Sequence, residues 1–134
     1  MPKIFESKVF ALHYQVCLID KEDHNPYPEW KTGEEQYVFG SKGIAVGLHV
    51  ERNVTAAVYK DTYGGAKDKY LGNVQISIGE EGILVGNVEV AETHEIPIPK
   101  GEYNIDIYVA ETANSANVDF VIINNIEKIK SITN

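Results

Sequence analysis

The stretch IPIPKGEYNIDIYV, Ile96 to Val109, decides the fold class of this chain. From Glu102 onward, polar residues alternate with Tyr103, Ile105, Ile107 and Val109. A period of two is typical of a strand that is buried on one face only. We therefore expect Glu102 and Asp106 to point to solvent from the same face of this strand.

The two prolines ahead of this strand predict that a sheet edge precedes it. Pro97 and Pro99 lack backbone N–H groups on the same side of the chain, so this segment can pair with a neighbour on its other side only. The prolines also oppose pairing of this edge with a second copy of the chain. Pro99 to Gly101 has the composition of a turn, with Gly101 free to adopt a positive φ.

Strand-like alternation recurs along most of the chain and predicts an all-β fold, an antiparallel β-sandwich of about eight strands in a single domain of residues 1–134. The connection Glu51 to Asn53 resembles that of a hairpin. The expected strands include one with Phe10, Leu12, Tyr14, Val16 and Leu18 on one face, Gly43 to Val50, Val54 to Tyr59, one with Tyr70, Val74, Ile76 and Ile78 pointing inward, Ile83 to Val90 after a turn at Gly79 to Gly82, and Val118 to Ile123.

Two segments depart from the strand pattern. Residues 20 to 42 form a long connection that contains the single tryptophan of the chain, Trp30. Loops of this length are usually functional or carry a short helix, and Thr32 to Glu35 has the spacing of a capping box, which is compatible with one helical turn. Near the C-terminus Ile126, Ile129 and Ile132 recur every three residues, which fits either a short helix or a frayed tail.

Charge and cysteine content restrict the class of protein. The formal net charge is -8 at pH 7, which disfavours binding to nucleic acid phosphates or to anionic membranes and favours binding to basic surfaces. The single Cys17 cannot form an internal disulfide, lies in an apolar strand pattern and is read as a free core thiol. Together with the absence of a signal-peptide or membrane-spanning pattern, it predicts a cytoplasmic protein.

Two groups of residues are candidates for binding a protein partner. The first choice is an acidic surface, although its carboxylates are equally well explained as charges that only solvate the edge of a sheet. The second is the long loop, whose aromatic and acidic side chains are typical of interface hot spots, although Trp30 is as well explained as a lid over the core. The first group comprises Glu89, Glu92, Glu95, Glu102 and Asp106, and the second comprises Tyr27, Glu29 and Trp30.

Catalytic and metal-binding motifs are weak or absent. The sequence lacks a glycine-rich phosphate loop, a nucleophile elbow and cysteines or histidines at metal-ligand spacing. A zinc site built from the four scattered histidines, or a calcium site near Asp20, Glu22, Asp23 and Asn25, is the weaker interpretation beside ordinary structural roles. We therefore expect no cofactor, no metal and no enzymatic activity.

Several motifs occur in a fixed order from the first strand nearly to the C-terminus. The longest is the run Val74 to Val109, with its E-x-G-I turn and P-K-G-E-Y corner. The elements ahead of it are LHYQVCLIDKED (Leu12 to Asp23), Pro28-Glu29-Trp30, the pair Glu34 and Glu35 with Tyr37, Gly43 to Asn53, and the strand TAAVY. In this order the motifs resemble the competence protein J family of nuclease inhibitors.

This resemblance implies a small cytoplasmic protein that binds and inhibits a DNA-degrading enzyme, such as the DNA-entry nuclease of competence systems, and that is not itself an enzyme. The charge points in the same direction, because a nuclease active site is basic where it holds phosphates, and an acidic surface can block it. The alternative is a β-sandwich module that binds a small molecule, a sugar or calcium through the loop Asp20 to Trp30. A hydrolase ranks third.

Overall fold

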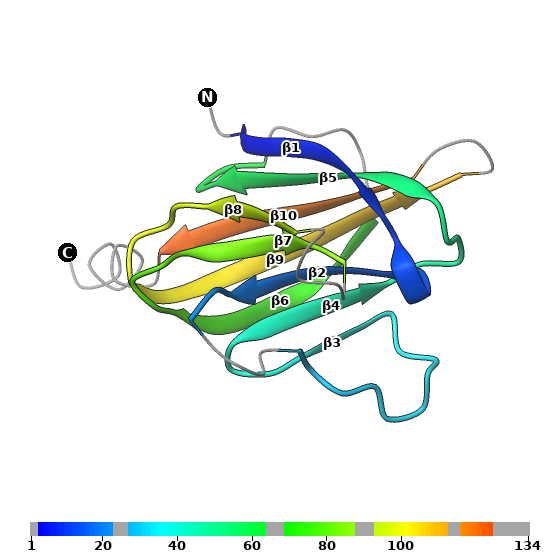
Figure 1. The fold of residues 1–134 in the computed structure, drawn as a ribbon, viewed down its shortest axis with the longest axis horizontal. Helices are drawn as coiled ribbons and strands as arrows, with labels where there is room; N and C mark the ends of the chain where they lie inside the picture. Colours follow the sequence, from blue (N-terminus) through cyan, green and yellow to red (C-terminus); the bar gives the residue numbers. More distant parts are fainter. Residues whose placement is uncertain (1–2, 23–26, 64–68, 88–92, 113–115, 125–134) are drawn as a thin grey trace.

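The chain folds into two five-stranded β-sheets (Figure 1). The computed structural model describes residues 3–22, 27–63, 69–87, 93–112 and 116–124. Sheet A contains, in spatial order, β1 (Lys3–Phe10), β5 (Asn53–Lys60), β10 (Ala116–Asn124), β9 (Gly101–Glu111) and β6 (Lys69–Ile78). Sheet B contains β3 (Tyr37–Phe39), β4 (Gly43–Gly47), β2 (Gln15–Asp20), β7 (Ile83–Gly86) and β8 (Thr93–Ile96).

The strand pairing confirms the all-β prediction and adds one feature that the sequence did not predict. All pairs in both sheets are antiparallel except β5 with β10, which run parallel in the middle of sheet A. A parallel pair requires a crossover connection. Here the chain between β5 and β10 first builds β6 in the same sheet, then β7 and β8 in the other sheet, and returns through β9.

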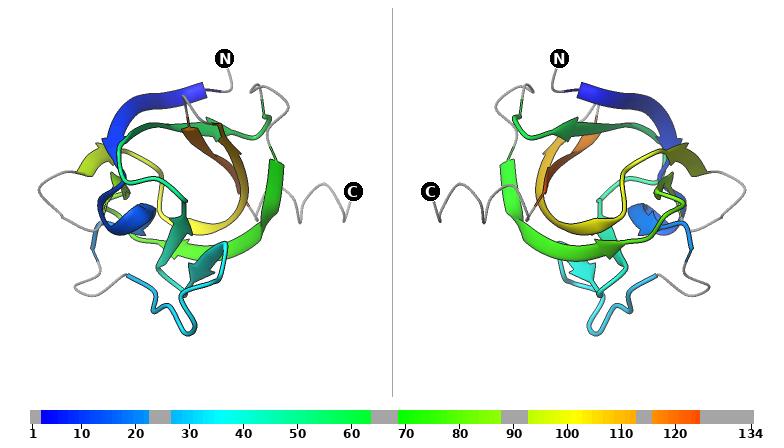
Figure 2. Two further views of the ribbon diagram at one scale, coloured as in Figure 1. Left: turned by 90° about the vertical axis from the view of Figure 1, so that its right-hand side faces the viewer. Right: turned by 90° about the vertical axis from the view of Figure 1, so that its left-hand side faces the viewer.

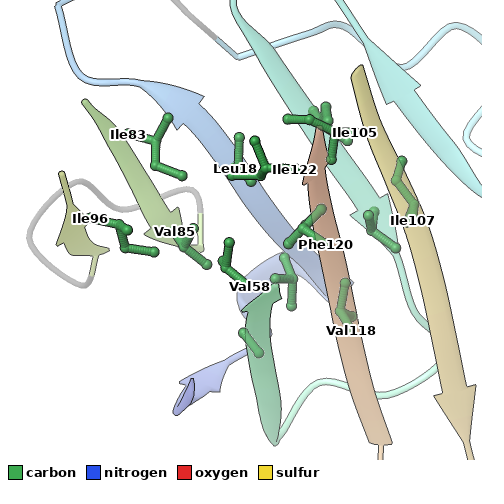
Figure 3. Close-up of a cluster of buried hydrophobic side chains, with 14 of the residues drawn as sticks. Leu18, Val58, Ile83, Val85, Ile96, Ile105, Ile107, Val118, Phe120 and Ile122 are labelled. Carbon is green, nitrogen blue, oxygen red and sulfur yellow. The ribbon is translucent and has the colours of Figure 1, made fainter. Parts of the chain in front are cut away.

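The main hydrophobic core lies between the two sheets, as Figure 3 shows. It joins Leu18 of sheet B to Ile105 and Phe120 of sheet A, and all three are fully buried. The predicted alternation in β9 is confirmed, because Tyr103, Ile105 and Ile107 are buried, whereas Glu102 is exposed. Burial of such side chains is the dominant stabilising contribution in a domain of this size.

The two sheets approach each other along both edges, so that they curve around the core in the end-on views of Figure 2. On one side, the rings of Phe5 in β1 and His94 in β8 lie 5.5 Å apart, centroid to centroid. On the other side, the backbone N–H of Ser77 in β6 donates to the carbonyl of Ser41, just after β3, over 2.9 Å. The predicted edge strand before Pro97 is confirmed, since β8 is an edge strand of sheet B.

A second, smaller apolar cluster covers the outer face of sheet B. It contains Cys17, Ile19, Val38, Ala45 and Leu84, and the partly buried Tyr27 and Trp30 of the long connection pack against it. Strand β2 is therefore buried on both faces. Cys17 is a free, buried thiol, as predicted, and burial raises its pKa to about 12.

The predicted strand from Phe10 to Leu18 is wrong. The chain forms β1, breaks at a 3-10 turn, η1 (Leu12–Tyr14), and then enters β2 in the other sheet. His13 and Tyr14 adopt φ of 56° and 62°, a region that non-glycine residues rarely occupy. This break exposes Phe10 and Tyr14, which the alternation had placed in the core.

The predicted hairpin between Gly43 and Tyr59 is also wrong, because β4 belongs to sheet B and β5 to sheet A. Its connection crosses from one sheet to the other. Tyr70, expected to point inward, is 51% exposed. The cause is a register shift between Tyr70 and Gly72, since one extra residue reverses the face to which the preceding side chain points.

Two local predictions about loops are partly correct. The side chains of Thr32 and Glu35 make the expected reciprocal contacts, because Glu35 accepts from the Thr32 N–H and Thr32 Oγ1 accepts from the Glu34 N–H, each over 3.1 Å. No helical turn forms in the described residues 27–42. Gly101 begins β9 without a positive φ; among the described glycines, Gly33 and Gly82 have one. Residues 126–132 lie outside the described part of the chain.

Candidate protein-binding face

The acids of the first candidate surface lie on two different sides of the molecule. Glu102 and Asp106 point outward from β9 in sheet A. Glu95 lies opposite Leu84 in the β7–β8 pair, and Leu84 belongs to the cluster on the outer face of sheet B. Because paired residues of neighbouring strands share a face, Glu95 points away from sheet A. Glu89 and Glu92 lie outside the described residues.

Both acids of sheet A are held in place by polar side chains of the neighbouring strand β6. Glu102 lies opposite Ser77, whose hydroxyl donates to it over 2.5 Å. Asp106 lies opposite Asn73, whose amide donates over 2.8 Å, and it also accepts from the Tyr70 hydroxyl over 3.3 Å. These bonds fix the two carboxylates on a rigid sheet without neutralising their charge.

Tyrosine rings lie beside these acids on the same outer face. The rings of Tyr63 and Tyr108 stack, with centroids 4.1 Å apart and an interplanar angle of 13°. Tyr70 lies against Tyr108 with a centroid distance of 5.3 Å. Its partial burial, followed by the nearby charge of Asp106, raises the pKa of Tyr70 above its usual value. The Tyr70 phenol is therefore neutral at physiological pH and donates its one hydrogen bond to Asp106.

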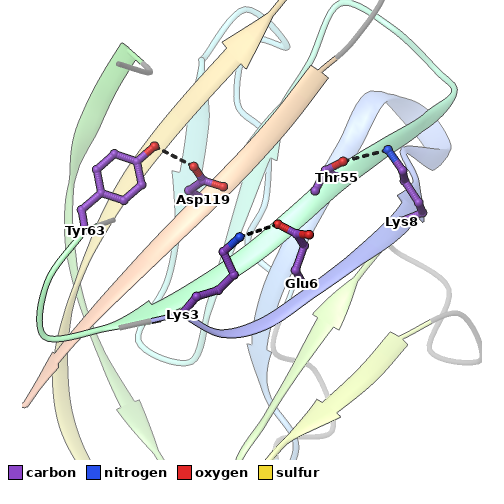
Figure 4. A network of polar contacts seen from close by, with 6 residues as sticks. All are labelled: Lys3, Glu6, Lys8, Thr55, Tyr63 and Asp119. Carbon is purple, nitrogen blue, oxygen red and sulfur yellow. Dashed lines mark hydrogen bonds and ion pairs between the residues drawn. The ribbon is translucent and has the colours of Figure 1, made fainter. Parts of the chain in front are cut away.

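A third carboxylate, Asp119, lies under the tyrosines and is only 4% exposed. The Tyr63 hydroxyl donates to it over 2.6 Å (Figure 4). This bond ties the segment after β5 down onto the middle strand of sheet A. Figure 4 also shows that the β1 side of this face carries Lys8 and the ion pair between Lys3 and Glu6. The half over β10, β9 and β6 carries the carboxylates Asp119, Glu102 and Asp106.

We name this half the tyrosine–carboxylate face. It comprises Glu102, Asp106, Asp119, Tyr63, Tyr70 and Tyr108. Of these six residues, only Glu102 and Asp106 were predicted from the sequence. Tyr108 and Asp119 alternate outward along their strands, so their faces could be read from the sequence. Tyr63 and Tyr70 could not be placed, because Tyr63 enters from a loop and Tyr70 immediately precedes a bulge.

The residues of the second candidate group do not form a projecting surface. Trp30 packs on the outer cluster of sheet B, and its indole N–H donates to the side-chain oxygen of Gln15 over 3.0 Å. Tyr27 packs on the same cluster, whereas Glu29 is exposed. The lid interpretation of Trp30 therefore holds. Its ring also forms part of the wall of an open groove of about 590 Å³, which the sequence did not predict.

The candidate metal ligands have structural partners instead. His49 lies 3.0 Å from a Glu111 carboxylate oxygen, and the buried Asp20 accepts from the Gly79 N–H over 3.2 Å. Across the described residues, no three or more histidine, cysteine or acidic side chains gather as a metal site would require. His24, Asp23 and Asn25 lie outside those residues. No helix in the described part of the chain is long and apolar enough to cross a membrane.

Comparison with known proteins gives matches among solved structures. The crystal structure of ComJ from Bacillus subtilis, an inhibitor of the DNA-degrading activity of NucA, superimposes with a TM-score of 0.74 over 91% of this chain and 96% of ComJ, at 11% sequence identity. This chain has a ComJ-like fold. The resemblance expected from the sequence motifs is thereby confirmed for the fold.

A second solved structure is less similar to this chain. The protein described as crocagin biosynthetic gene J matches with a TM-score of 0.56 at 6% identity, over 90% of this chain and 95% of that protein. No family model matches the sequence, and no curated protein matches it either. The common fold is therefore recognised through structure and not through sequence similarity.

Proposed function

We propose that this ComJ-like chain is a protein inhibitor of a DNA-degrading nuclease and is not itself an enzyme. The observation that carries this proposal is the match to ComJ over nearly the whole of both chains. ComJ inhibits the DNA-degrading activity of NucA. The formal net charge of -8 supports the same role, because it suits a basic partner and opposes binding to DNA itself.

The tyrosine–carboxylate face is the proposed docking surface. Glu102 and Asp106 stand on the same outward face of one strand, with Asn104 between them, as fixed anions that can take the place of DNA phosphates in a basic cleft. Tyr70, half-exposed and packed against Tyr108 at a tilted angle of 57°, supplies an aromatic ring of the kind that is enriched at interface hot spots. Asp119 and Tyr63 hold this arrangement from below.

Such an inhibitor blocks the active site by occupying it, without chemistry of its own. Opposite charges on the two proteins would make association fast at low salt and slower at high salt. We further propose that the chain acts in the cytoplasm, where inhibition protects the DNA of the cell that produces the nuclease.

Capture of the nuclease followed by an activity assay tests the proposal. The chain is immobilised, exposed at low salt to an extract of its source cell, and washed with a salt gradient. The salt-eluted fraction is expected to degrade plasmid DNA, and adding back the free chain is expected to stop this degradation. A salt eluate without nuclease activity, together with a sugar- or calcium-dependent rise in melting temperature, would contradict the proposal and favour a ligand-binding module.

A further inference from the structure

The groove beside η1 is an open depression of about 590 Å³. Its walls come from η1, the connection around Trp30 and the segment after β4, and they include His13, Tyr14, Trp30, Glu34, Glu35 and His49. This volume lies within the range of about 300–1,000 Å³ that is typical of ligand sites.

The indole of Trp30 is a fixed wall of this groove. Its N–H donates to Gln15, and its ring lies so close to Gly47 that a Cβ atom at Gly47 would stand 3.0 Å from the indole. The same ring packs on the outer cluster of sheet B. Because these contacts already fix the indole, it loses little side-chain conformational entropy when a flat cationic group stacks on it.

The part of the wall that η1 supplies has unfavourable backbone geometry. His13 and Tyr14 both adopt left-handed φ values. Each such residue is disfavoured by roughly 1–2 kcal/mol, and strained backbone of this kind is concentrated at functional sites. Backbone bonds hold the turn, because Tyr14 N–H donates to Ala11 over 2.9 Å and the Tyr14 carbonyl accepts from the Leu48 N–H over 2.8 Å. Tyr14 is thereby presented at the rim, 50% exposed.

The charge of the groove is acidic. Among the described residues that line it, there are two carboxylates, Glu34 and Glu35, and no lysine or arginine. Glu35 is engaged by the backbone N–H groups of Lys31 and Thr32, and hydrogen bonds, chiefly from the Thr32 side chain, lower its pKa to about 2. Glu34 is exposed at the rim. A cation entering beside Trp30 would therefore meet two ionised carboxylates.

We infer that this groove receives an arginine side chain of the protein partner, which stacks on Trp30 and pairs with Glu34. A guanidinium combines the planar face that an indole binds with the fork of donors that a carboxylate binds. This inference rests on the proposed function, because it makes the groove a second contact for a basic nuclease.

The groove and the tyrosine–carboxylate face lie on the outer sides of different sheets. Trp30 in the groove wall packs on the outer cluster of sheet B, whereas Glu102 and Asp106 point outward from sheet A. Tyr37, next to Gln36 of the groove, lies against Gly72 of β6 at the edge where the two sheets meet. The groove is therefore a second contact site, which a partner on the first face reaches around this edge.

Titration of the free chain with a small arginine derivative tests the inference without any nuclease. The probe is Nα-acetyl-arginine amide, the control is its neutral isostere Nα-acetyl-citrulline amide, and the readout is the fluorescence of Trp30, the only tryptophan. We expect a saturable change in Trp30 fluorescence with the arginine derivative and no such change with the citrulline derivative. Glu34→Gln should weaken its binding about two- to fivefold, as expected for an exposed ion pair, whereas Glu81→Gln, at a distant turn, should not.

The outcomes separate this inference from the proposed function. An equal response to the arginine and citrulline derivatives, or unchanged binding in Glu34→Gln, would overturn the groove inference. So would the absence of a fluorescence change, even if the chain inhibits a nuclease. A specific arginine response in a chain that captures and inhibits no nuclease would support the chemistry of the groove and contradict the proposed function.

Discussion

Removal of one hydroxyl, in the variant Tyr63→Phe, should destabilise the chain far more than the same change at Tyr70. Tyr63 donates over 2.6 Å to Asp119, which is only 4% exposed. A hydrogen bond to a charged group contributes about 1.5–3 kcal/mol. Phenylalanine keeps the ring stacked on Tyr108, so the loss of the hydrogen bond should account for most of the effect.

The control Tyr70→Phe removes the same atom from a different environment. Tyr70 is 51% exposed, and its bond to Asp106 is long, at 3.3 Å. Water can replace this bond, so we expect a change within about 0.5 kcal/mol. For a domain of this size, 1 kcal/mol corresponds to roughly 3–5 °C in melting temperature. Tyr63→Phe should therefore melt about 5–15 °C below the unmodified chain, and Tyr70→Phe should melt close to it.

Urea unfolding at neutral pH, followed by far-ultraviolet circular dichroism, measures both variants against the unmodified chain. The slope of the free energy of unfolding against urea concentration should be equal in the two variants and the unmodified chain, so that the midpoints of unfolding can be compared directly. If the free energy of unfolding of Tyr63→Phe lies within about 0.5 kcal/mol of that of Tyr70→Phe, the buried Asp119 does not depend on Tyr63, and our account of how the face is held is refuted.

Three further predictions follow from single residues. Cys17, whose pKa burial raises to about 12, should not react with a thiol reagent at pH 8 until the chain is unfolded in urea; rapid reaction of the native chain would contradict its burial. The pKa of Glu35 is lowered to about 2 from a usual 4.5, so the ionised carboxylate stabilises the fold above pH 4.5, and this stabilisation is lost as the pH falls towards 2. Glu35→Gln should therefore make the free energy of unfolding depend less on pH in this window. An unchanged pH profile would contradict this prediction. Gly82→Ala should destabilise by about 1–3 kcal/mol, because Gly82 has a φ of 83° and a Cβ would lie 2.6 Å from the Ile96 carbonyl; an unchanged melting temperature would contradict this.

Local pattern predicted the strands well where one face is buried and the other is open. The alternation in β9 and the edge position of β8 follow from Tyr103 to Ile107 and from Pro97 and Pro99, without knowledge of distant contacts. The local pattern could not predict which of the two sheets each strand joins. The turn after β4 has the composition of a hairpin, yet β4 and β5 join different sheets, because core packing between the two layers decides their partners.

The candidate site was predicted in part for the same reason. Glu102 and Asp106 were placed correctly on one solvent face, but Glu95 was grouped with them by sequence proximity, although the turn after β8 carries the chain to the other sheet. The contact between Tyr63 and Asp119 joins residues that are 56 positions apart. No local sequence pattern predicts such a contact. The bulge near Tyr70 likewise depends on the pairing of β6 with β9.

Charge reversal on two different faces tests the central claim most directly. The variant Glu102→Lys/Asp106→Lys changes the tyrosine–carboxylate face, and the matched control Glu81→Lys/Glu95→Lys changes exposed acids beside Lys21. Each reversal adds two charges, so both variants change the formal net charge from -8 to -4. In an assay of DNA degradation by the captured nuclease, we expect the first variant to inhibit at least about tenfold more weakly and the control to inhibit almost as well as the unmodified chain. Equal inhibition by the two folded variants would contradict docking through this face.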